Sequence, residues 1–278
     1  MAISVHTNQS ALIALQNLNN TSGQLDDVQG RISTGLRIAN AKDNASVWSI
    51  AQDQRAAIGA LGAVKMSLDR ASGIGQVTMT AGESVSDLLV QIKEKVVSAM
   101  DPSLDTASRT ALNADYKSLL RQITQVVAAA NFNGANLLDG SLATDIKFLA
   151  NDAATQFVTL SVKNMSLGGA IITMASTSSI GTSTIATTVL ARIDASLANV
   201  NAALGDIGAQ AKQVDNHNTF VSKLTDVLQV GVGNLVDADL AKEGARLQAL
   251  QVQQQLGAQA LSIANTAPQI LLSLFRGG

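Results

Sequence analysis

The chain has 278 residues, of which only 14% are charged, and its formal net charge is −2. Soluble domains carry roughly 25% charged residues, so this protein is lightly charged, and its apolar residues are mainly aliphatic because aromatics make up 3%. No basic cluster is present, which argues against duplex nucleic acid as a partner, since neutralising a phosphate backbone needs concentrated positive charge. The lack of cysteine excludes disulfides, thiolate metal sites and cysteine nucleophiles.

The apolar runs of the chain are short. A membrane-spanning helix needs about 20 consecutive apolar residues, and stretches such as residues 167–175 fall well below this length. No Lys or Arg precedes Arg31, so the basic region of a secretory signal peptide is missing. We therefore expect no membrane contact, and we expect another export route if the protein leaves the cell.

The first predicted element is a helix with an apolar stripe at alternating steps of three and four residues, the pattern of helices that pack along their length. The stripe consists of Leu12, Leu15, Leu18, Leu25, Val28, Ile32 and Leu36. Gly23, Gly30 and Gly35 lie in the same segment, and each glycine costs about 1 kcal/mol relative to alanine in a helix interior. We expect this helix to depend on contacts from outside itself.

Four further stripes of this kind fill most of the middle of the chain. They span residues 47–68, 85–100, 112–130 and 189–228. Asp101-Pro102-Ser103 separates the second from the third, and because proline does not fit inside a helix, these two stripes predict an antiparallel helical hairpin. We expect four long helices that share one core.

The period changes between residues 131 and about 188. Asn133-Gly134 and Asp139-Gly140 are turn dipeptides, and residues 146–149 and 157–162 predict a small β-hairpin. Residues 173–188 are dominated by Ser and Thr, a composition that favours a surface loop. We expect that loop to be exposed in any assembly.

A last stripe, at the C-terminal end, matches the first in character. It consists of Leu240, Leu247, Leu250, Leu261, Ala264 and Leu271, and Gly244 and Gly257 interrupt it. Long helices with so little charge on their solvent side need neighbours on several sides. Both ends therefore have the character of a polymer subunit.

Sequence signatures at both ends carry a family resemblance. Residues 31–45 read RISTGLRIANAKDNA, residues 5–8 read VHTN, and the far end contains ADLAKE at 238–243, ALSIAN at 260–265 and PQILLSLFR at 268–276. On these residues the chain resembles the bacterial flagellins over nearly its whole length. It departs from them at Phe275, where Leu is commoner, and in the added Gly277-Gly278.

The resemblance implies a mainly α fold, in which long coiled-coil-like helices pack as a bundle beside a small β-hairpin region. Residues 1–40 would form an inner-tube helix and a spoke, residues 235–278 the paired inner-tube helix, and residues 41–234 the outer-tube domain, with the hairpin region at about 131–188. No large outer domain is expected. The residues expected to pack in the inner tube are Leu12, Leu15, Leu18, Leu25, Leu240, Leu247, Leu261 and Leu271.

Arg31, Arg37, Lys42 and Asp43 form a charged group between two turn signals. Exposure is the usual state of charged residues, so they could be the solvated face of a bend between helices. The resemblance favours the spoke, where these charges would pair with neighbouring subunits during polymerisation.

No residues suggest catalysis or a bound cofactor. His6 and His217 have no acidic partners at metal-ligand spacing. The chain lacks a phosphate-binding Gly-Lys-Ser/Thr loop and a Gly-x-Ser-x-Gly motif, and Gly73-Ile-Gly75 does not follow a predicted strand. We expect no metal, no cofactor and no enzymatic activity, and a packing role for Trp48.

The stretch around Glu94 resembles the segment through which some flagellins are sensed by an animal Toll-like receptor. Gln91 stands where that segment has an Arg, and Lys95 stands where it has a Leu. A receptor contact that needs a guanidinium group and an apolar neighbour would lose both. We expect weak or absent receptor activation, which potent signalling by purified monomer in reporter cells would contradict.

The Ser/Thr run has two interpretations. It is a flexible solvated loop by default, and by resemblance it is a candidate for O-glycosylation, which an intact mass equal to the unmodified chain would exclude. The candidate residues are Ser176, Thr177, Ser178, Ser179, Thr182 and Ser183.

The function that the resemblance implies is that of the extracellular flagellar filament subunit, exported unfolded through the flagellar type III apparatus and its export gate. Residues 1–40 and about 235–278 would be disordered in the free subunit, with residues 240–275 bound by an export chaperone in a helix-in-groove manner. The filament would meet junction and cap proteins at its ends. A hook-filament junction protein is the nearest alternative, and a cytosolic coiled-coil scaffold is disfavoured because it should carry abundant flanking charges.

Overall fold

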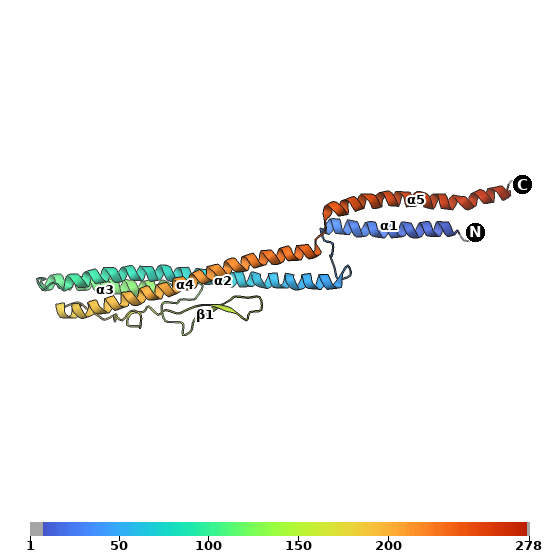
Figure 1. The fold of residues 1–278 in the computed structure, drawn as a ribbon. Helices are drawn as coiled ribbons and strands as arrows, with labels where there is room; N and C mark the ends of the chain where they lie inside the picture. Colours follow the sequence, from blue (N-terminus) through green and yellow to red (C-terminus); the bar gives the residue numbers. More distant parts are fainter. Residues whose placement is uncertain (1–7, 277–278) are drawn as a thin grey trace. The chain divides into compact units, whose positions relative to one another are not determined.

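The computed structural model describes the backbone of residues 8–276 and the side chains of residues 8–266. Five helices and one two-stranded sheet follow one another along this part of the chain (Figure 1). Their bounds are α1 Gln9–Thr34, α2 Ala45–Ala99, α3 Thr106–Ala129, β1 Ile146–Leu149, β2 Phe157–Leu160, α4 Ser183–Val236 and α5 Leu240–Arg276. The fold is mainly α, as predicted.

Each helix begins behind a polar side chain that accepts a hydrogen bond from a backbone N–H of the first turn, which would otherwise lack a partner. The accepting residues are Asn8, Asn44, Asp105, Thr182 and Asp239. The sequence thus encodes all five helix starts locally.

Contacts divide the chain into two compact units. Unit 1 comprises residues 1–56 and 227–278, and unit 2 comprises residues 57–226. The expected boundaries at residues 40 and 235 separate the inner-tube segments from the outer-tube domain of a filament. The structure of one chain does not test them, so they stay a prediction. Among the described residues, no helix combines the length and the apolar character that a membrane-spanning segment requires.

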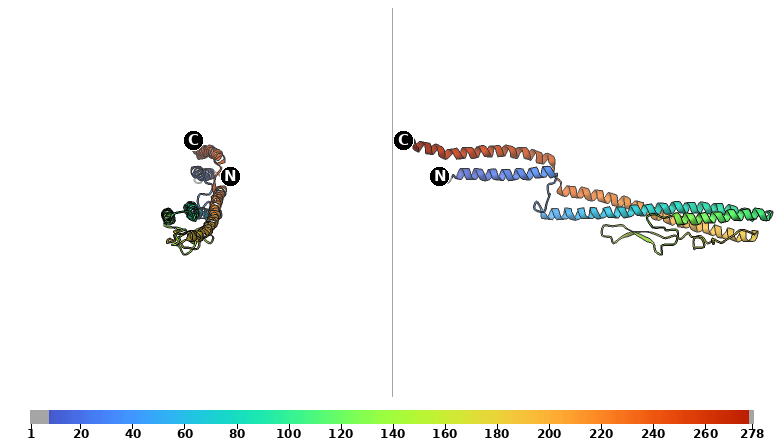
Figure 2. Two further views of the ribbon diagram at one scale, coloured as in Figure 1. Left: turned by 90° about the vertical axis from the view of Figure 1, so that its left-hand side faces the viewer. Right: turned by 180° about the vertical axis from the view of Figure 1, so that it is seen from behind.

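Unit 2 is built on one apolar core shared by α2, α3 and α4 (Figures 1 and 2). Leu89 and Ile92 of α2, Tyr116 and Ile123 of α3, and Ile193 of α4 are all fully buried in it. The hairpin predicted around Pro102 is confirmed, because α2 ends at Ala99 and α3 begins at Thr106.

The expected number of four helices in the middle of the chain is wrong. The first two stripes belong to one helix, α2, so three helices build the bundle. Its internal glycines do not break it. A Cβ on Gly82 would lie 2.5 Å from Leu204 Cδ2, so this glycine allows α4 to approach, whereas a Cβ on Gly75 would lie at an ordinary contact distance of 3.5 Å from Ala211 Cβ.

The predicted turns and hairpin are confirmed. Asn133 and Gly134 have φ of 52° and 82° in a turn closed by Phe132 and Ala135, and Gly140 has φ of 75°. β1 and β2 pair antiparallel. Their buried side chains, including Phe148, face the unit, as alternation requires.

The expectation of an exposed loop over residues 173–188 is wrong in part. Met174, Ile180 and Ala186 are fully buried in the core of unit 2, and α4 already begins at Ser183. The apolar residues spaced through the Ser/Thr run pack into the core and hold the run against unit 2. The high Ser and Thr content of the run as a whole does not indicate this packing.

Candidate assembly site

In unit 1, α1 and α5 lie side by side and run antiparallel (Figures 1 and 2). On each helix the less exposed residues recur at alternating steps of three and four, the spacing of a coiled-coil seam. On α1 they are Ala11, Ala14, Leu18, Thr21, Leu25, Val28 and Ile32. On α5 they are Glu243, Leu247, Leu250, Gln254, Gly257, Leu261 and Ala264.

Contacts along the whole seam fix one register between the two helices. The Asn8 amide Nδ2 donates to the Ala264 carbonyl at 2.7 Å, which ties the N-terminal cap of α1 to α5. Leu18 fills the space beside Gly257, where a Cβ would lie 3.4 Å from Leu18 Cδ1. At the other end Leu25, Val28 and Leu250 form a small buried cluster.

The predicted inner-tube leucines do not all lie in this seam. Leu25 is buried and Leu18, Leu247 and Leu261 are half-buried, whereas Leu12, Leu15 and Leu240 are exposed. The side chain of Leu271 lies outside the described residues. Packing of the exposed leucines in a polymer stays a prediction.

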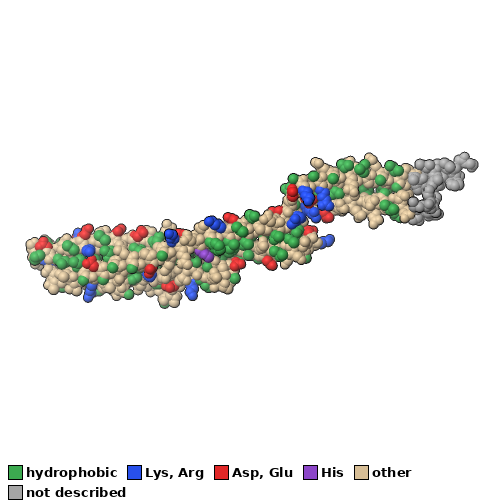
Figure 3. Space-filling model, in the orientation of Figure 1, with side chains coloured by type: hydrophobic (Ala, Val, Ile, Leu, Met, Phe, Trp, Pro, Cys, Tyr) green, Lys and Arg blue, Asp and Glu red, His purple; other side chains and the backbone are tan. Residues whose placement is uncertain are grey.

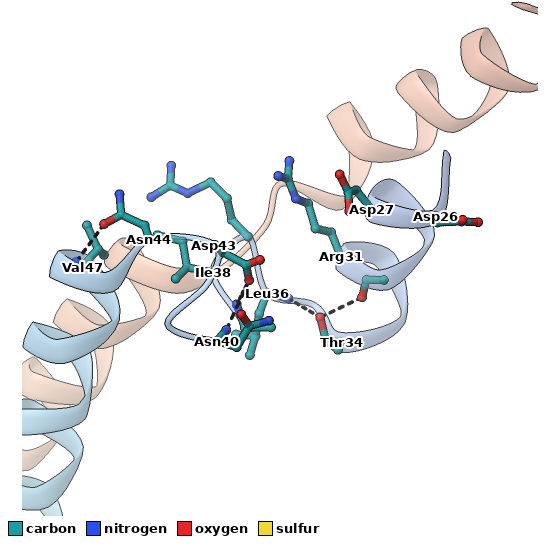
Figure 4. A pocket seen from close by; sticks show the side chains of 13 residues that line it. Asp26, Asp27, Arg31, Thr34, Leu36, Ile38, Asn40, Asp43, Asn44 and Val47 are labelled. Carbon is teal, nitrogen blue, oxygen red and sulfur yellow. Dashed lines mark hydrogen bonds between the residues drawn. The ribbon is translucent and has the colours of Figure 1, made fainter. Parts of the chain in front are cut away.

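A backbone ladder at the bend joins residues 35–37, which follow α1, to residues 236–238 at the junction of α4 and α5. Arg37 N–H donates to the Val236 carbonyl at 2.7 Å, and Ala238 N–H donates to the Gly35 carbonyl at 2.9 Å. Gly35 adopts φ of 72°, a left-handed conformation that favours glycine at the end of a helix. A hollow of about 740 Å³ opens beside this bend, lined by residues between 26 and 47 (Figure 4).

The four predicted spoke residues lie around the bend. Arg31 forms an ion pair with Glu243 at 3.4 Å, and the Arg37 guanidinium donates to the Leu235 carbonyl at 2.8 Å. The Asp43 carboxylate turns back to accept from the N–H groups of residues 39 and 40 (Figure 4). Lys42 is exposed. These contacts order the bend within one chain, and pairing with neighbouring subunits stays a prediction.

Glu243 belongs to this site, and the sequence reasoning missed it. The residue is 8% exposed, and its Oε2 atom is buried without a hydrogen-bond partner. The available signal was its spacing, since it lies four residues before Leu247 on the seam stripe. A buried carboxylate with one long ion pair adds little stability, and its best-attested use is to specify pairing.

The charges of unit 1 gather at the bend. Residues 1–25 and 247–275 contain no Asp, Glu, Lys or Arg. The surface of the helix pair beyond the bend is correspondingly apolar or uncharged (Figure 3). Exposed Leu12, Ile13, Val252, Leu256 and Ile263 lie on that surface.

The remaining predicted residues lie in unit 2. Gln91 and Glu94 are exposed on α2, and Lys95 forms an ion pair with Asp115 of α3 at 3.0 Å. Of the candidate glycosylation residues, Ser176, Thr177 and Thr182 are exposed and Ser178, Ser179 and Ser183 are half-buried. The Ser178 hydroxyl is hydrogen-bonded to the Tyr116 hydroxyl.

The histidines form no metal site in the part of the chain that the structure describes. His217 Nε2 donates to the Ala150 carbonyl at 2.6 Å, which fits a structural role. Among the described residues no three His, Asp or Glu side chains come together around a cation position. His6 lies outside those residues.

Comparisons with known proteins match most of the chain, including the residues of this site, to one protein family. Residues 5–143 match the family described as the bacterial flagellin N-terminal helical region, and residues 190–275 match the bacterial flagellin C-terminal helical region. The chain is 57% identical to flagellin FljJ of Caulobacter vibrioides over 100% of both chains. It is 40% identical to a flagellin of Brucella melitensis over 99% of each.

A solved structure has the same kind of fold. The crystal structure of Bacillus cereus flagellin aligns with a TM-score of 0.50 and 19% identity, covering 56% of this chain and 88% of that one. At this identity the likeness concerns the fold alone.

Proposed function

The chain belongs to the bacterial flagellin family and is an extracellular structural subunit of the flagellar filament, and we propose that its paired helices α1 and α5 form the inner tube. Unit 2 would form the outer tube. The observation that carries this proposal is the part of the helix pair beyond the bend, where residues 1–25 and 247–275 carry no charge and apolar side chains are left exposed, because exposed apolar patches of this kind mark interaction surfaces. Nothing in the comparisons favours the hook-filament junction protein.

The bend around Arg31 acts as the spoke of this arrangement. Its backbone ladder and the Arg31–Glu243 ion pair hold α1 and α5 in one register. The neighbouring charges Arg37, Lys42 and Asp43 lie on an exposed surface that a second subunit can reach. Charged groups at the edge of an interface set orientation more than affinity, so this group fixes how subunits meet.

Folding of the helix pair is coupled to polymerisation. Isolated helices are marginal in water, and the buried cluster of the pair is small. In the free subunit, the small buried area of the helix pair therefore does not offset the conformational entropy that the two helices lose when they become ordered. The segments at residues 1–40 and about 235–278 are disordered during type III export and fold when the subunit joins the filament.

The partners follow from the same segments. An export chaperone binds the apolar face of residues 240–275 in a groove, and the export gate receives the chain before the junction and cap proteins meet the filament ends. We propose neither a nucleic-acid nor a membrane partner and no enzymatic activity. Gln91 and Lys95 support weak or absent activation of the Toll-like receptor.

The experiment that tests the proposal compares wild type, Arg31→Ala and the control Arg55→Ala, whose exposed side chain donates a hydrogen bond to Gln52 of its own helix. We expect wild type and Arg55→Ala to form filaments that sediment and resist limited proteolysis at both ends. Arg31→Ala should remain largely monomeric, with both ends cleaved quickly and residues 57–226 intact.

Circular dichroism of the monomers provides the reference, because all three should retain the helical signal of unit 2. Filament yield and protease resistance of Arg31→Ala equal to those of wild type would refute the spoke. Ends that resist proteolysis equally in wild-type monomer and filament would refute the coupling of folding to polymerisation.

A further inference from the structure

The turn that follows helix α3 contains a pair of residues with a chemistry of its own. An Asn-Gly pair occurs once in the chain, at Asn133-Gly134, and both residues are exposed. Asn is a thermolabile residue, and a following glycine favours the loss of its side-chain amide, because glycine leaves the next backbone nitrogen sterically open. The pair is therefore a candidate site of covalent modification.

The reaction takes place between atoms of these two residues. The Gly134 backbone nitrogen attacks the Asn133 side-chain carbon Cγ, so that a C–N bond forms, the Cγ–Nδ2 bond breaks, and the departing group leaves as ammonia with the Gly134 amide proton. Water then opens the cyclic imide at either carbonyl, which gives aspartate or isoaspartate, and nothing is oxidised or reduced. The Gly134 nitrogen must therefore be free to reach Cγ and to lose its proton.

The fold restrains this nitrogen. Gly134 N–H donates to the Asn131 Oδ1 atom at 2.9 Å. Around the pair, Phe132 and Ala135 exchange two backbone hydrogen bonds of 3.0 Å, and the positive φ of Asn133 and Gly134 is what a type I′ turn requires. Ring closure requires the peptide unit between the two residues to rotate, which would break the bond to Asn131. The turn must therefore open before the reaction can occur.

Both flanks of the turn are fixed to unit 2. On one side the Phe132 ring packs on α2 at Gly73, where a Cβ would lie 2.9 Å from Phe132 Cζ. On the other side the buried Asn136 amide Nδ2 donates to the Val127 carbonyl at 2.7 Å. Local opening is rarer where a segment has such contacts, so the two flanks also slow the reaction.

We infer that Asn133 is a modification site that the fold keeps unreacted, and that Asn131 is the positioning residue that restrains the Gly134 nitrogen. Chains in which the turn opens convert to aspartate and isoaspartate. Isoaspartate inserts a CH₂ group into the backbone, which does not fit a two-residue turn, because loop length fixes the turn type and the pairing of its flanks. Conversion therefore adds negative charge and loosens the link between α3 and the hairpin region.

Peptide mass mapping of the full-length monomer tests this inference. Trypsin releases residues 122–147 as one peptide, since no Lys or Arg lies between Arg121 and Lys147, and fragmentation locates the converted residue. Wild type is incubated folded and in guanidinium chloride at the same mildly alkaline pH. We expect conversion at Asn133 to be about tenfold or more slower in the folded chain, because the reaction there needs local opening.

Three variants test the part played by Asn131. Asn131→Ala should speed conversion in the folded chain about threefold or more, because the closed turn loses one hydrogen bond. Asn131→Asp keeps a side-chain acceptor and should react no faster than wild type. The control is Asn151→Ala, which removes a similar side-chain acceptor of backbone N–H groups from the hairpin loop and should leave the rate at Asn133 unchanged. All four chains should react equally in guanidinium chloride.

The outcomes separate this inference from the proposed function. Equal rates in folded and unfolded wild type would overturn protection by the fold. A rate for folded Asn131→Ala equal to that of wild type, or matched by Asn151→Ala, would overturn the role of Asn131. The measurement involves no filament, so none of these results bears on the proposed function, and a failure to polymerise would leave this inference intact.

Discussion

Units 1 and 2 are both built from long helices with apolar residues at heptad spacing, yet only unit 2 encloses a core. In unit 2 three helices and the hairpin region cover one another, and large side chains such as Tyr116, Phe148 and Leu89 are fully buried. In unit 1 the α1–α5 contact buries a small cluster around Leu25. The same sequence pattern therefore gives a well-filled core where three helices cover one another and leaves apolar side chains exposed where only two helices pair.

The largest effect should come from removing core volume in unit 2. Leu89→Ala should lower the free energy of unfolding of the monomer by about 2–5 kcal/mol, because the truncated side chain leaves a cavity among well-packed neighbours. Leu25→Ala, the matched change in unit 1, should leave the monomer unfolding midpoint unchanged and lower the thermal stability of the filament. Denaturant unfolding followed by circular dichroism measures the first, and filament melting measures the second.

This pair of variants tests whether the two units differ in stability in the free subunit. If Leu25→Ala destabilised the monomer as much as Leu89→Ala, the α1–α5 pair would already be a folded part of the free subunit.

A second prediction contrasts two helix glycines. Gly82→Ala should stabilise the monomer less than the gain in helix propensity of about 1 kcal/mol, because its Cβ would lie 2.5 Å from Leu204 Cδ2 and this leucine must shift. Gly30→Ala has no neighbour within 4 Å, so it should raise the helix propensity of α1 by about 1 kcal/mol. Thermal unfolding checks Gly82→Ala, and the helical signal of the monomer checks Gly30→Ala. A smaller gain for Gly82→Ala than for Gly30→Ala would support the difference between the two units, and equal gains would contradict close packing of Leu204 on Gly82.

The smallest effect concerns Tyr116 in the core of unit 2. Burial raises the pKa of its phenol above the ordinary value of 10.0, against the opposing effects of Ser178 and Arg192. The neutral phenol is favoured in the fold, so its contribution is complete below pH 10 and is lost as the pH rises through the folded pKa. Tyr116→Phe should cost about 1 kcal/mol at pH 7, where the Ser178 hydroxyl loses its partner.

The same variant should also lose less stability than wild type between pH 9 and 11. Urea unfolding at these pH values measures the difference. Equal alkaline losses in the two proteins would show that the Tyr116 phenol is not held neutral by the fold.

Much of the fold could be predicted from local signals. Side-chain caps such as Asn8 and Asp105 mark the helix starts, and Asn133-Gly134 marks a turn whose φ values only such residues adopt readily. Alternation predicted the hairpin around Phe148. These signals are readable because their causes lie within a few residues of one another.

The errors arose where the cause was distant in the chain. The gap between the apolar stripes at residues 47–68 and 85–100 suggested two helices, but one continuous helix, α2, spans both stripes, and α4 packs against it at Gly82. The Ser/Thr run suggested a solvated loop, but Met174 and Ile180 anchor it in the core. Neither outcome follows from propensity, because tertiary contacts override it.

The helical class, the antiparallel hairpin around Pro102, the turns and the scarcity of charge at both ends could be predicted without coordinates, because each depends on local conformation or on composition. Which apolar residues face a partner within the chain depends instead on how distant helices pack. This packing places Leu25 in the seam and leaves Leu12 and Leu15 exposed, and it pairs Arg31 with Glu243. The reason is physical: a stripe specifies that a helix face will be buried, and only the register of two packed helices specifies against what.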